Sequence, residues 1–263
     1  PAPGRAIVLS LPRGGEQPND RRYPIAVLGP GFRGLLTSDS TRIPGLVSIA
    51  DVAPTALGRD EGLGSEPDTE PVAELERLDE RIDANNGSRK TASRLAAVLL
   101  VLLALAAPRA AVLGVAVLLA ANLVLGIVGT TSESVLLALV VLAVAVGGPV
   151  AALAIRSAIG VGLVLAAVLG AYLLAFLVDD RWVALSPLGP TQNARFYGIS
   201  NLLETLLLVP ALAGAALLAR RHVALAGVVA AVAFVVIAAS RFGADGGGGI
   251  PRRTEKQRPC AWR

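Results

Sequence analysis

The sequence contains very few of the side chains on which metal centres, disulfides and histidine-dependent catalysis depend. Its 263 residues include no methionine, a single cysteine, Cys260, and a single histidine, His222. One cysteine cannot form an internal disulfide, and one residue of each kind cannot supply a Cys/His zinc site. We therefore expect no metal site, no cofactor and no catalytic residues of a histidine triad in this sequence.

Lysine and aromatic residues are scarce as well. Lys90 and Lys256 are the only lysines, so arginine carries nearly all of the positive charge behind the net charge of +4, and aromatic residues make up 4% of the chain. A surface that binds nucleic acid usually combines a basic patch with aromatic side chains, and the sequence has no such stretch. Nucleic acid is therefore excluded as a partner.

Apolar residues, by contrast, are abundant. They make up 54% of the chain, and its mean hydropathy is +0.63. Nearly all of the long apolar runs lie after Thr91. This asymmetry predicts a mainly α fold, in which a polytopic helical bundle of about six spans lies in a lipid bilayer and follows a polar N-terminal part.

Residues 1–60 carry two short apolar runs that have the length of buried strands. The runs are Ala6–Leu11 and Tyr23–Leu28, and each is bounded by Gly, Pro and Arg. Gly29-Pro30-Gly31 then predicts a turn. Asp51 stands at the start of the next predicted helix, where its carboxylate would cap the free amide hydrogens of the first turn.

The run YPIAVLGPGFRGLLTSDSTRIPGLVSIADVAPTALG resembles the C-terminal part of an alkaline-phosphatase/sulfatase-like domain. In that superfamily a central strand ends in a Gly-Pro-Gly turn, and a D-x-x-P-T helix start follows. The resemblance implies that residues 1–60 are the C-terminal remnant of such an α/β domain. The family's nucleophile and most of its metal ligands lie upstream, so the resemblance implies a fold without catalytic residues. We expect the sequence to be a fragment that lacks its N-terminus.

An acidic stretch over residues 61–90 predicts a linker with an amphipathic helix over residues 71–84. Pro71 suits the first turn of a helix, and apolar residues then recur at helical spacing on one face while carboxylates occupy the other. Asn85-Asn86-Gly87 predicts the end of this helix. We expect the helix to pack on the N-terminal domain or to lie near the membrane, and a partner-binding role is the alternative.

The apolar runs after residue 90 predict six membrane spans, each of about 20 residues. Pro108-Arg109 separates the first two runs, which would together form a helix of about 50 Å, too long for one crossing. Gly147-Gly148-Pro149 predicts a kink inside the third span. The predicted transmembrane domain, residues 91–240, has spans at residues 91–107, 110–128, 135–155, 157–178, 201–219 and 223–239.

The charges between the predicted spans indicate their orientation. The loops after spans one, three and five contain Arg109, Arg156 and Arg220-Arg221-His222 and no acid. The positive-inside rule therefore places these loops in the cytoplasm. The N-terminal segment and the polar loop Ser186–Glu204 are then extracytoplasmic in a multi-pass plasma-membrane protein. Basic residues just before the first span run against this assignment, but they adjoin a domain, where the rule is weaker.

The loop Ser186–Glu204 holds the polar groups that are best placed for binding. Asn201 and Glu204 are one helical turn apart at the mouth of the fifth span, so both point the same way. An acid at such a place usually faces protein or a water-filled cavity. A structural ion pair between Glu204 and Arg195 is the alternative. The candidate substrate- or headgroup-binding residues are Asn193, Arg195, Tyr197, Asn201, Glu204, Arg241 and Asp245.

Two further runs, N-A-R-F-Y-G-I-S-N-x-x-E and F-G-A-D-G-G-G-G, resemble uncharacterised bacterial multi-pass proteins in which an alkaline-phosphatase-like domain precedes the spans. That family usually has glycine where Ser200 stands, and apolar sequence where this chain reads IPRRTEKQ. Residues 241–263 are therefore expected to be a Gly-rich segment and a basic tail. The tail is either genuine or the product of a truncated or frameshifted reading.

Together these patterns and resemblances predict a multi-pass plasma-membrane protein, the membrane part of an extracytoplasmic phosphatase- or phosphotransferase-like protein. Its substrates would be lipid-linked or anionic groups of the cell envelope. A transporter or flippase-like module, with Arg195, Glu204 and Asp245 lining a path, is a second hypothesis. A membrane anchor or scaffold without catalysis is a third.

Overall fold

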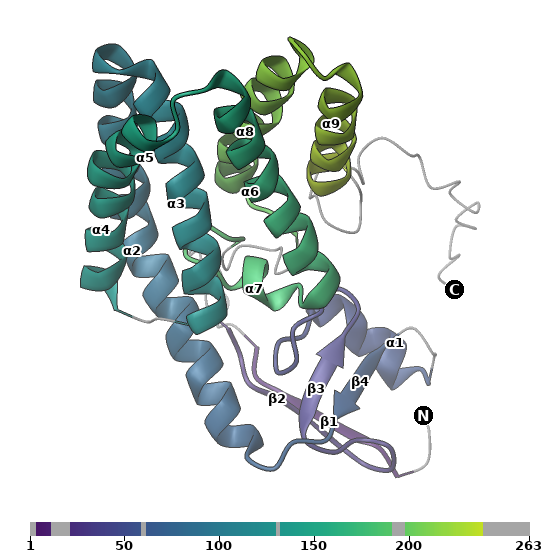
Figure 1. The fold of residues 1–263 in the computed structure, drawn as a ribbon. Helices are drawn as coiled ribbons and strands as arrows, with labels where there is room; N and C mark the ends of the chain where they lie inside the picture. The colour runs from purple at the N-terminus through teal and green to yellow at the C-terminus, as the bar shows by residue number, and fades with distance from the viewer. Residues whose placement is uncertain (1–3, 12–21, 59–61, 130–131, 191–197, 239–263) are drawn as a thin grey trace, which may run out of the picture.

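The computed structural model describes residues 4–11, 22–58, 62–129, 132–190 and 198–238. Within these ranges the chain is mainly helical. The helices lie side by side in a bundle, and the strands lie beyond one end of it (Figure 1). One long helix, α2 (Pro71–Ala106), extends from the strand region into the bundle. The described chain thus consists of a strand-containing N-terminal region and a helical bundle.

The N-terminal region is built from two separate antiparallel strand pairs, β1 with β2 and β3 with β4. β1 and β2 lie inside the two apolar runs that predict buried strands, but neither strand is buried, because every residue in them is exposed or half-buried. Gly29 and Gly31 form the turn after β2 with positive φ angles. The short elements of this region are β1 (Ala6–Leu9), β2 (Ile25–Leu28), β3 (Leu35–Ser38), the 3₁₀ helix η1 (Ile49–Asp51), α1 (Val52–Ala56) and β4 (Leu63–Glu66).

Asp51 does not cap a helix, so that prediction is wrong. Its carboxylate accepts hydrogen bonds from the hydroxyl groups of Ser38 and Ser40, the latter at 2.9 Å. Its side chain makes no capping bond to α1. Ser48 instead caps η1, because its Oγ accepts a hydrogen bond from Ala50 N at 3.2 Å. The Asp51 carboxylate, which the sequence predicts as a helix cap, therefore binds serine hydroxyls at and just after the end of β3 instead.

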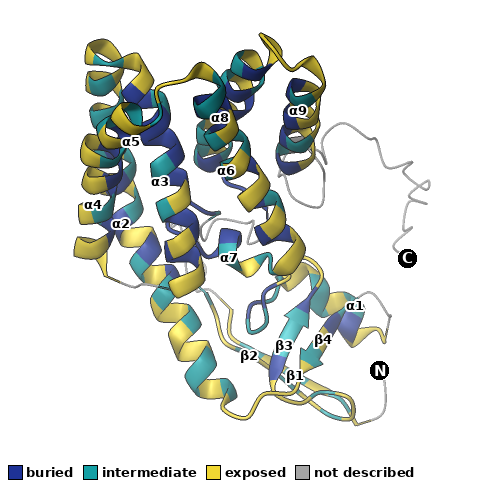
Figure 2. Cartoon of the chain, in the orientation of Figure 1, coloured by how far each residue is buried: buried dark blue, intermediate teal, exposed yellow. Residues whose placement is uncertain are grey.

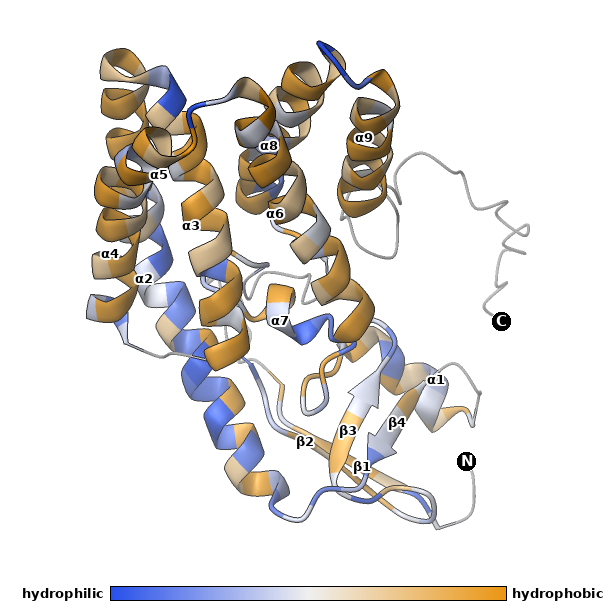
Figure 3. Ribbon diagram, in the orientation of Figure 1, coloured by the Kyte–Doolittle hydropathy of each residue, from blue (hydrophilic) through white to orange (hydrophobic). Residues whose placement is uncertain are grey.

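The helix α2 also corrects the prediction that a linker helix ends at Asn85-Asn86-Gly87. α2 runs through 36 residues without a break, which is about 54 Å at 1.5 Å per residue. Asn85 is buried, and its Nδ2 donates to the carbonyl oxygen of Leu185 at 3.0 Å. That contact uses the amide that could otherwise compete with the helix backbone. Figure 3 shows α2 changing from hydrophilic to hydrophobic as it enters the bundle.

Among the described residues, four helical segments are long and apolar enough to cross a membrane. They agree with four predicted spans, and the start of α3 at Pro108, just after α2 ends, confirms the predicted hairpin. The apolar half of α2 and a shorter helix, α9 (Val223–Ala238), complete the bundle. The four segments are α3 (Pro108–Val128), α4 (Glu133–Val141) with η2 (Leu142–Gly147) and α5 (Gly148–Ala154), α6 (Ala158–Val178), and α8 (Asn201–Ala219).

The third predicted span is interrupted by a π-helical turn, η2, rather than by its proline. Pro149 lies directly after η2, so its missing N–H falls where the hydrogen-bonding pattern changes from π to α. The neighbouring Gly148 is needed for a different reason. A Cβ there would lie 2.6 Å from the carbonyl oxygen of Ala110, so glycine allows α5 to pack directly on α3.

The bundle has a buried apolar core, and many apolar side chains also lie on its outer surface. Tyr172 of α6 and Leu203 of α8 are fully buried between the helices. By contrast, Leu105, Leu153 and Leu212 are 82%, 72% and 69% exposed. Figures 2 and 3 show that much of the exposed face of the bundle is hydrophobic. A surface of this kind is suited to lipid rather than to water, so the bundle is that of a membrane protein.

Candidate functional site

After α6 the chain turns back into the bundle before it reaches α8. Every residue from Val183 to Gly189 is buried, and we call this stretch the re-entrant segment. It begins in the short helix α7 (Arg181–Ala184), which Figure 1 shows near the end of the bundle that faces the strands. Beyond Ala184 the segment is not helical. Its buried backbone groups therefore need partners from local turns or from side chains.

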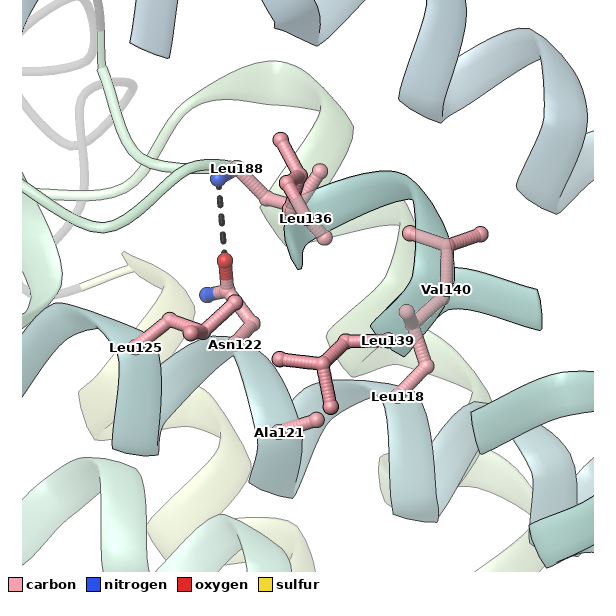
Figure 4. Close-up of a pocket in the computed structure, with 8 residues that line it drawn as sticks. All are labelled: Leu118, Ala121, Asn122, Leu125, Leu136, Leu139, Val140 and Leu188. Carbon is pink, nitrogen blue, oxygen red and sulfur yellow. Dashed lines mark hydrogen bonds between the residues drawn. The ribbon is translucent and has the colours of Figure 1, made fainter. Parts of the chain in front are cut away.

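Asn122 of α3 is the central partner of the re-entrant segment. It is buried, and its Oδ1 accepts a hydrogen bond from Leu188 N at 2.9 Å (Figure 4). Its Nδ2 donates to Tyr172 Oη and to Ser186 Oγ, each at 3.0 Å. Tyr172 Oη donates in turn to the carbonyl oxygen of Leu119 at 3.0 Å. One amide thus joins α3, α6 and the re-entrant segment, and both of its N–H donors are used.

Side chains from α2 and α8 bind the carbonyl groups of the same segment. The carbonyl oxygen of Leu185 accepts hydrogen bonds from Asn85 Nδ2 at 3.0 Å and from Arg81 Nε at 3.2 Å. The carbonyl oxygen of Leu188 accepts one from Ser200 Oγ at 2.6 Å. Ser200 also caps α8, so the start of that helix is attached to the segment. Side chains of α2 and α3 and the cap of α8 therefore hold this piece of non-helical chain in place.

The void beside Asn122 is too small to hold a substrate. Its volume is about 10 Å³, which is close to the minimum that one water molecule needs. The buried polar cluster is therefore part of the framework of the bundle rather than a ligand pocket. Figure 4 shows the residues around the void, which are Leu118, Ala121, Asn122, Leu125, Leu136, Leu139, Val140 and Leu188.

A larger opening, which we call the junction cleft, lies where the N-terminal region meets the bundle. Its volume is about 630 Å³, within the range of roughly 300–1,000 Å³ that is usual for small-molecule sites. One wall comes from β3, β4 and the turn after β3, and the other comes from the end of α6 and the start of α7. The lining residues are Thr37, Ser38, Asp39, Arg42, Pro44, Gly62, Leu63, Gly64, Glu66, Val178, Asp179 and Arg181.

Aspartates hold both arginines of the junction cleft. Arg181 Nη2 lies 2.8 Å from Asp179 Oδ2, and Arg42 Nη1 lies 3.7 Å from Asp180 Oδ2. Partial burial opposes the ionisation of Asp179, but hydrogen bonds and charge from Arg181 outweigh it and hold the pKa of Asp179 below its ordinary value. Arg42 adopts a φ of 57°, an uncommon conformation for a residue with a side chain, which its surroundings must maintain.

Two sets of contacts attach the N-terminal region to the bundle near the cleft. Arg22 bridges the N-terminal region to α2, because its guanidinium lies 2.6 Å from Asp79 Oδ1 and 2.7 Å from Asp83 Oδ1. A small apolar cluster adds a second attachment that includes the re-entrant segment. Its buried members are Ile43, Leu46, Ile82, Ala184 and Leu185.

Most of the predicted binding residues lie outside the described residues, namely Asn193, Arg195, Tyr197, Arg241 and Asp245. Asn201 is exposed at the start of α8, and Glu204 is half-buried one turn later. The backbone N of Glu204 donates to the carbonyl oxygen of Ser200 at 2.8 Å, inside the helix cap. The ion pair with Arg195 and the wider cluster therefore stay predictions.

The sequence-based interpretation missed the polar residues that the structure brings together. Asn122 and Tyr172 are isolated polar residues within predicted spans, and such residues often form hydrogen bonds between helices. Their positions in the sequence could therefore have indicated a buried polar contact. The junction cleft gave no comparable signal. Its charged residues, among them Asp39, Glu66 and Arg181, come from segments that are far apart in the sequence.

Comparisons of the chain with protein-family models, with curated proteins and with solved structures found no match. The site must therefore be interpreted from its own chemistry. Within the described ranges, no three histidine, cysteine, aspartate or glutamate side chains converge as metal ligands would. What the junction cleft offers is guanidinium, carboxylate and hydroxyl groups, a set that suits a charged or polar ligand.

Proposed function

We propose that the chain is the membrane part of an extracytoplasmic phosphatase- or phosphotransferase-like protein of the plasma membrane, which acts on lipid-linked or anionic envelope substrates. In this proposal the apolar half of α2 and α9 also cross the bilayer, which makes six spans. Residues 1–60 belong to an alkaline-phosphatase-like α/β domain whose nucleophile and metal ligands lie upstream. The chain itself supplies the anchor and a site for a headgroup.

The position of the junction cleft is the observation that carries this proposal. Val178, the last residue of α6, lines the cleft and is 59% exposed, so the cleft opens where a candidate span ends. A lipid at this level would lay its acyl chains along the bundle and place its phosphate beside Arg181 and Arg42. Guanidinium groups suit this task because their N–H donors match phosphate oxygens.

An exposed apolar sheet face supports the assignment of the N-terminal region to a larger α/β domain. Ala6 and Val8 of β1 share one face with Ala26 and Leu28 of β2 in the antiparallel register. All four are exposed. A two-stranded sheet with an uncovered apolar face is marginally stable in isolation. Further strands and helices of the same domain would extend the sheet and cover this face.

The charges at the two ends of the bundle support an extracytoplasmic N-terminal region. Arg109, Arg156 and the Arg220-Arg221-His222 run lie at the connections between α2 and α3, α5 and α6, and α8 and α9. Figure 1 shows these connections at the end of the bundle opposite to the strands. By the positive-inside rule the arginine-rich end would face the cytoplasm, and the junction cleft would face outward.

Lipid retention by the purified full chain tests the proposal. Native mass spectrometry after extraction in mild detergent should show more bound phosphatidylglycerol than diacylglycerol with the same acyl chains. The double variant Arg42→Ala, Arg181→Ala should retain about tenfold less phosphatidylglycerol, since each exposed ionic contact is worth up to about 1 kcal/mol. Arg77→Ala, on the exposed face of α2, is the control. Equal retention of both lipids by the unaltered chain would contradict a headgroup site.

The re-entrant segment favours a transport or flipping module as a second candidate. Non-helical backbone inside a membrane bundle occurs where transporters form their binding sites. Glu204 lies in the first turn of α8, the helix that follows this segment. Flipping of a fluorescent lipid in proteoliposomes would then depend on Glu204, whereas the headgroup site does not require it. An anchor or scaffold without chemistry would show neither lipid selectivity nor flipping.

A further inference from the structure

The charges of the junction cleft are only partly neutralised within the described chain. There, the carboxylates of Asp39 and Glu66 take part in no ion pair or hydrogen bond, and both residues are exposed. Arg181 directs its Nε and Nη2 at Asp179, which leaves the N–H groups on Nη1 without a partner among the described residues. The cleft therefore presents unused acceptors on its strand wall and unused donors on its helix wall.

Glu66 and Arg181 belong to opposite walls of the cleft and form no direct ion pair. The hydrogen bond with Asp179 is the main cause of the raised pKa of Arg181, and the charge of Glu66 also raises it. Both also line the same open volume. Opposite charges that are separated by open space are complementary to a ligand that carries both signs.

We propose that the junction cleft binds a headgroup in which a phosphate and a primary ammonium are joined by a short linker, as in phosphoethanolamine. The ammonium lies beside Asp39 and Glu66, and the phosphate lies beside Arg181. A primary ammonium has three N–H donors and can serve two carboxylates, whereas a trimethylated ammonium has none. This inference rests on the proposed function, because it names the class of headgroup that the same cleft takes.

The balance of charge in the cleft argues against a purely anionic headgroup. Among the described residues, its lining contains three carboxylates, those of Asp39, Glu66 and Asp179, and two guanidinium groups. A phosphoglycerol headgroup could use Arg181, but it would leave two carboxylates facing hydroxyl groups and a negative charge. A zwitterion adds no net charge and pairs each of its ends with the opposite sign.

Matched phospholipids test the inference on the full chain in mild detergent. By native mass spectrometry, the chain should retain phosphatidylethanolamine about two- to fivefold better than phosphatidylglycerol or phosphatidylcholine, as expected for exposed ionic contacts. The double variant Asp39→Asn, Glu66→Gln should retain phosphatidylethanolamine only as well as phosphatidylglycerol. Glu76→Gln, on the exposed face of α2 outside the cleft, should leave the preference unchanged. Thermal unfolding of each variant separates a loss of binding from a loss of folding.

The outcomes separate this inference from the proposed function. Equal retention of phosphatidylethanolamine and phosphatidylglycerol, both above diacylglycerol, would overturn the zwitterion and leave the headgroup site standing. No preference over diacylglycerol would overturn both. A preference for phosphatidylethanolamine that survives the double substitution would also overturn the inference. If the preference is lost as expected, displacement by free phosphoethanolamine identifies the headgroup alone as the ligand, and its failure identifies the lipid.

Discussion

The re-entrant segment directly follows the helix wall of the junction cleft in sequence, but the two regions use polar groups in opposite ways. In the segment, Asn122 makes three hydrogen bonds and ties two helices to non-helical backbone. In the cleft, the carboxylates of Asp39 and Glu66 form no hydrogen bond or ion pair with the described residues. An unpaired polar group costs about 1–3 kcal/mol when buried, whereas water satisfies one at the surface. The hydrogen-bonded cluster around Asn122 therefore stabilises the fold, whereas the carboxylates of the cleft remain available to bind a ligand.

We expect Gly126→Ala to cause the largest loss of stability, because the added methyl group would push α3 away from α7. A Cβ at residue 126 would overlap the carbonyl oxygen of Trp182, and backbone cannot move aside as a flexible side chain can. The free energy of unfolding in detergent should fall by about 3 kcal/mol. Gly170→Ala on α6, with no atom within 4 Å of the added Cβ, is the control. It should be neutral or stabilising, and equal losses for both variants would contradict the close packing.

Asn122→Leu should lower the free energy of unfolding by about 2 kcal/mol, because Leu188 N would be left buried without its acceptor. Chemical unfolding in mixed micelles measures this loss. Val124→Ala, on the exposed face of the same helix, should cost much less. The lipid preference of Asn122→Leu should stay as it was. A lost preference with unchanged stability would show that Asn122 serves a ligand, and would remove the contrast between the two regions.

The smallest expected effect is the pH dependence that Asp179 adds at the junction cleft. Partial burial opposes its charge, but the contacts with Arg181 prevail, so its pKa in the folded protein is below the ordinary value. Its stabilising contribution is therefore complete above the ordinary carboxyl pKa of about 4 and is lost as the pH falls through the lower folded-state value. Because Arg181 is half exposed, we expect less than about 1 kcal/mol.

Unfolding curves recorded at successively lower pH check this prediction. Asp179→Asn should flatten the acid limb of the stability curve, whereas Glu76→Gln should leave its shape unchanged. An acid limb that is the same in the unaltered chain and in Asp179→Asn would show that the pair with Arg181 contributes nothing to stability. High salt should reduce the difference between the two, because screening weakens an exposed pair.

Much of the bundle could be predicted from sequence, but one helix boundary could not. The predicted fifth span and α8 have the same bounds, Asn201–Ala219, because Ser200 and the apolar run are local signals. The predicted end at Asn85-Asn86-Gly87 failed because Asn85 bonds to Leu185, 100 residues further along the chain. A local rule for helix ends cannot include a partner at that distance.

For the candidate site, too, local features could be predicted from sequence and long-range contacts could not. That Asn201 and Glu204 lie in one helical turn could be predicted from sequence, and their role in binding stays a prediction. The junction cleft could not be chosen, since it joins Glu66 of β4 to Arg181 of α7, and the sequence contains no signal for that approach. Polar residues within one element are therefore predictable as a group, whereas a site between elements needs the fold.

Composition and periodicity alone determined that this chain is a helical membrane protein with a polar N-terminal region. They suffice because each span must satisfy its own backbone and cover about 30 Å of hydrocarbon with consecutive apolar residues. Only the tertiary structure decided which polar groups are paired and which remain open. Asn122 and Glu66 differ in this respect because one is enclosed by three parts of the bundle and the other borders an open cleft. Burial and pairing depend on which distant segments meet, and local sequence does not contain that information.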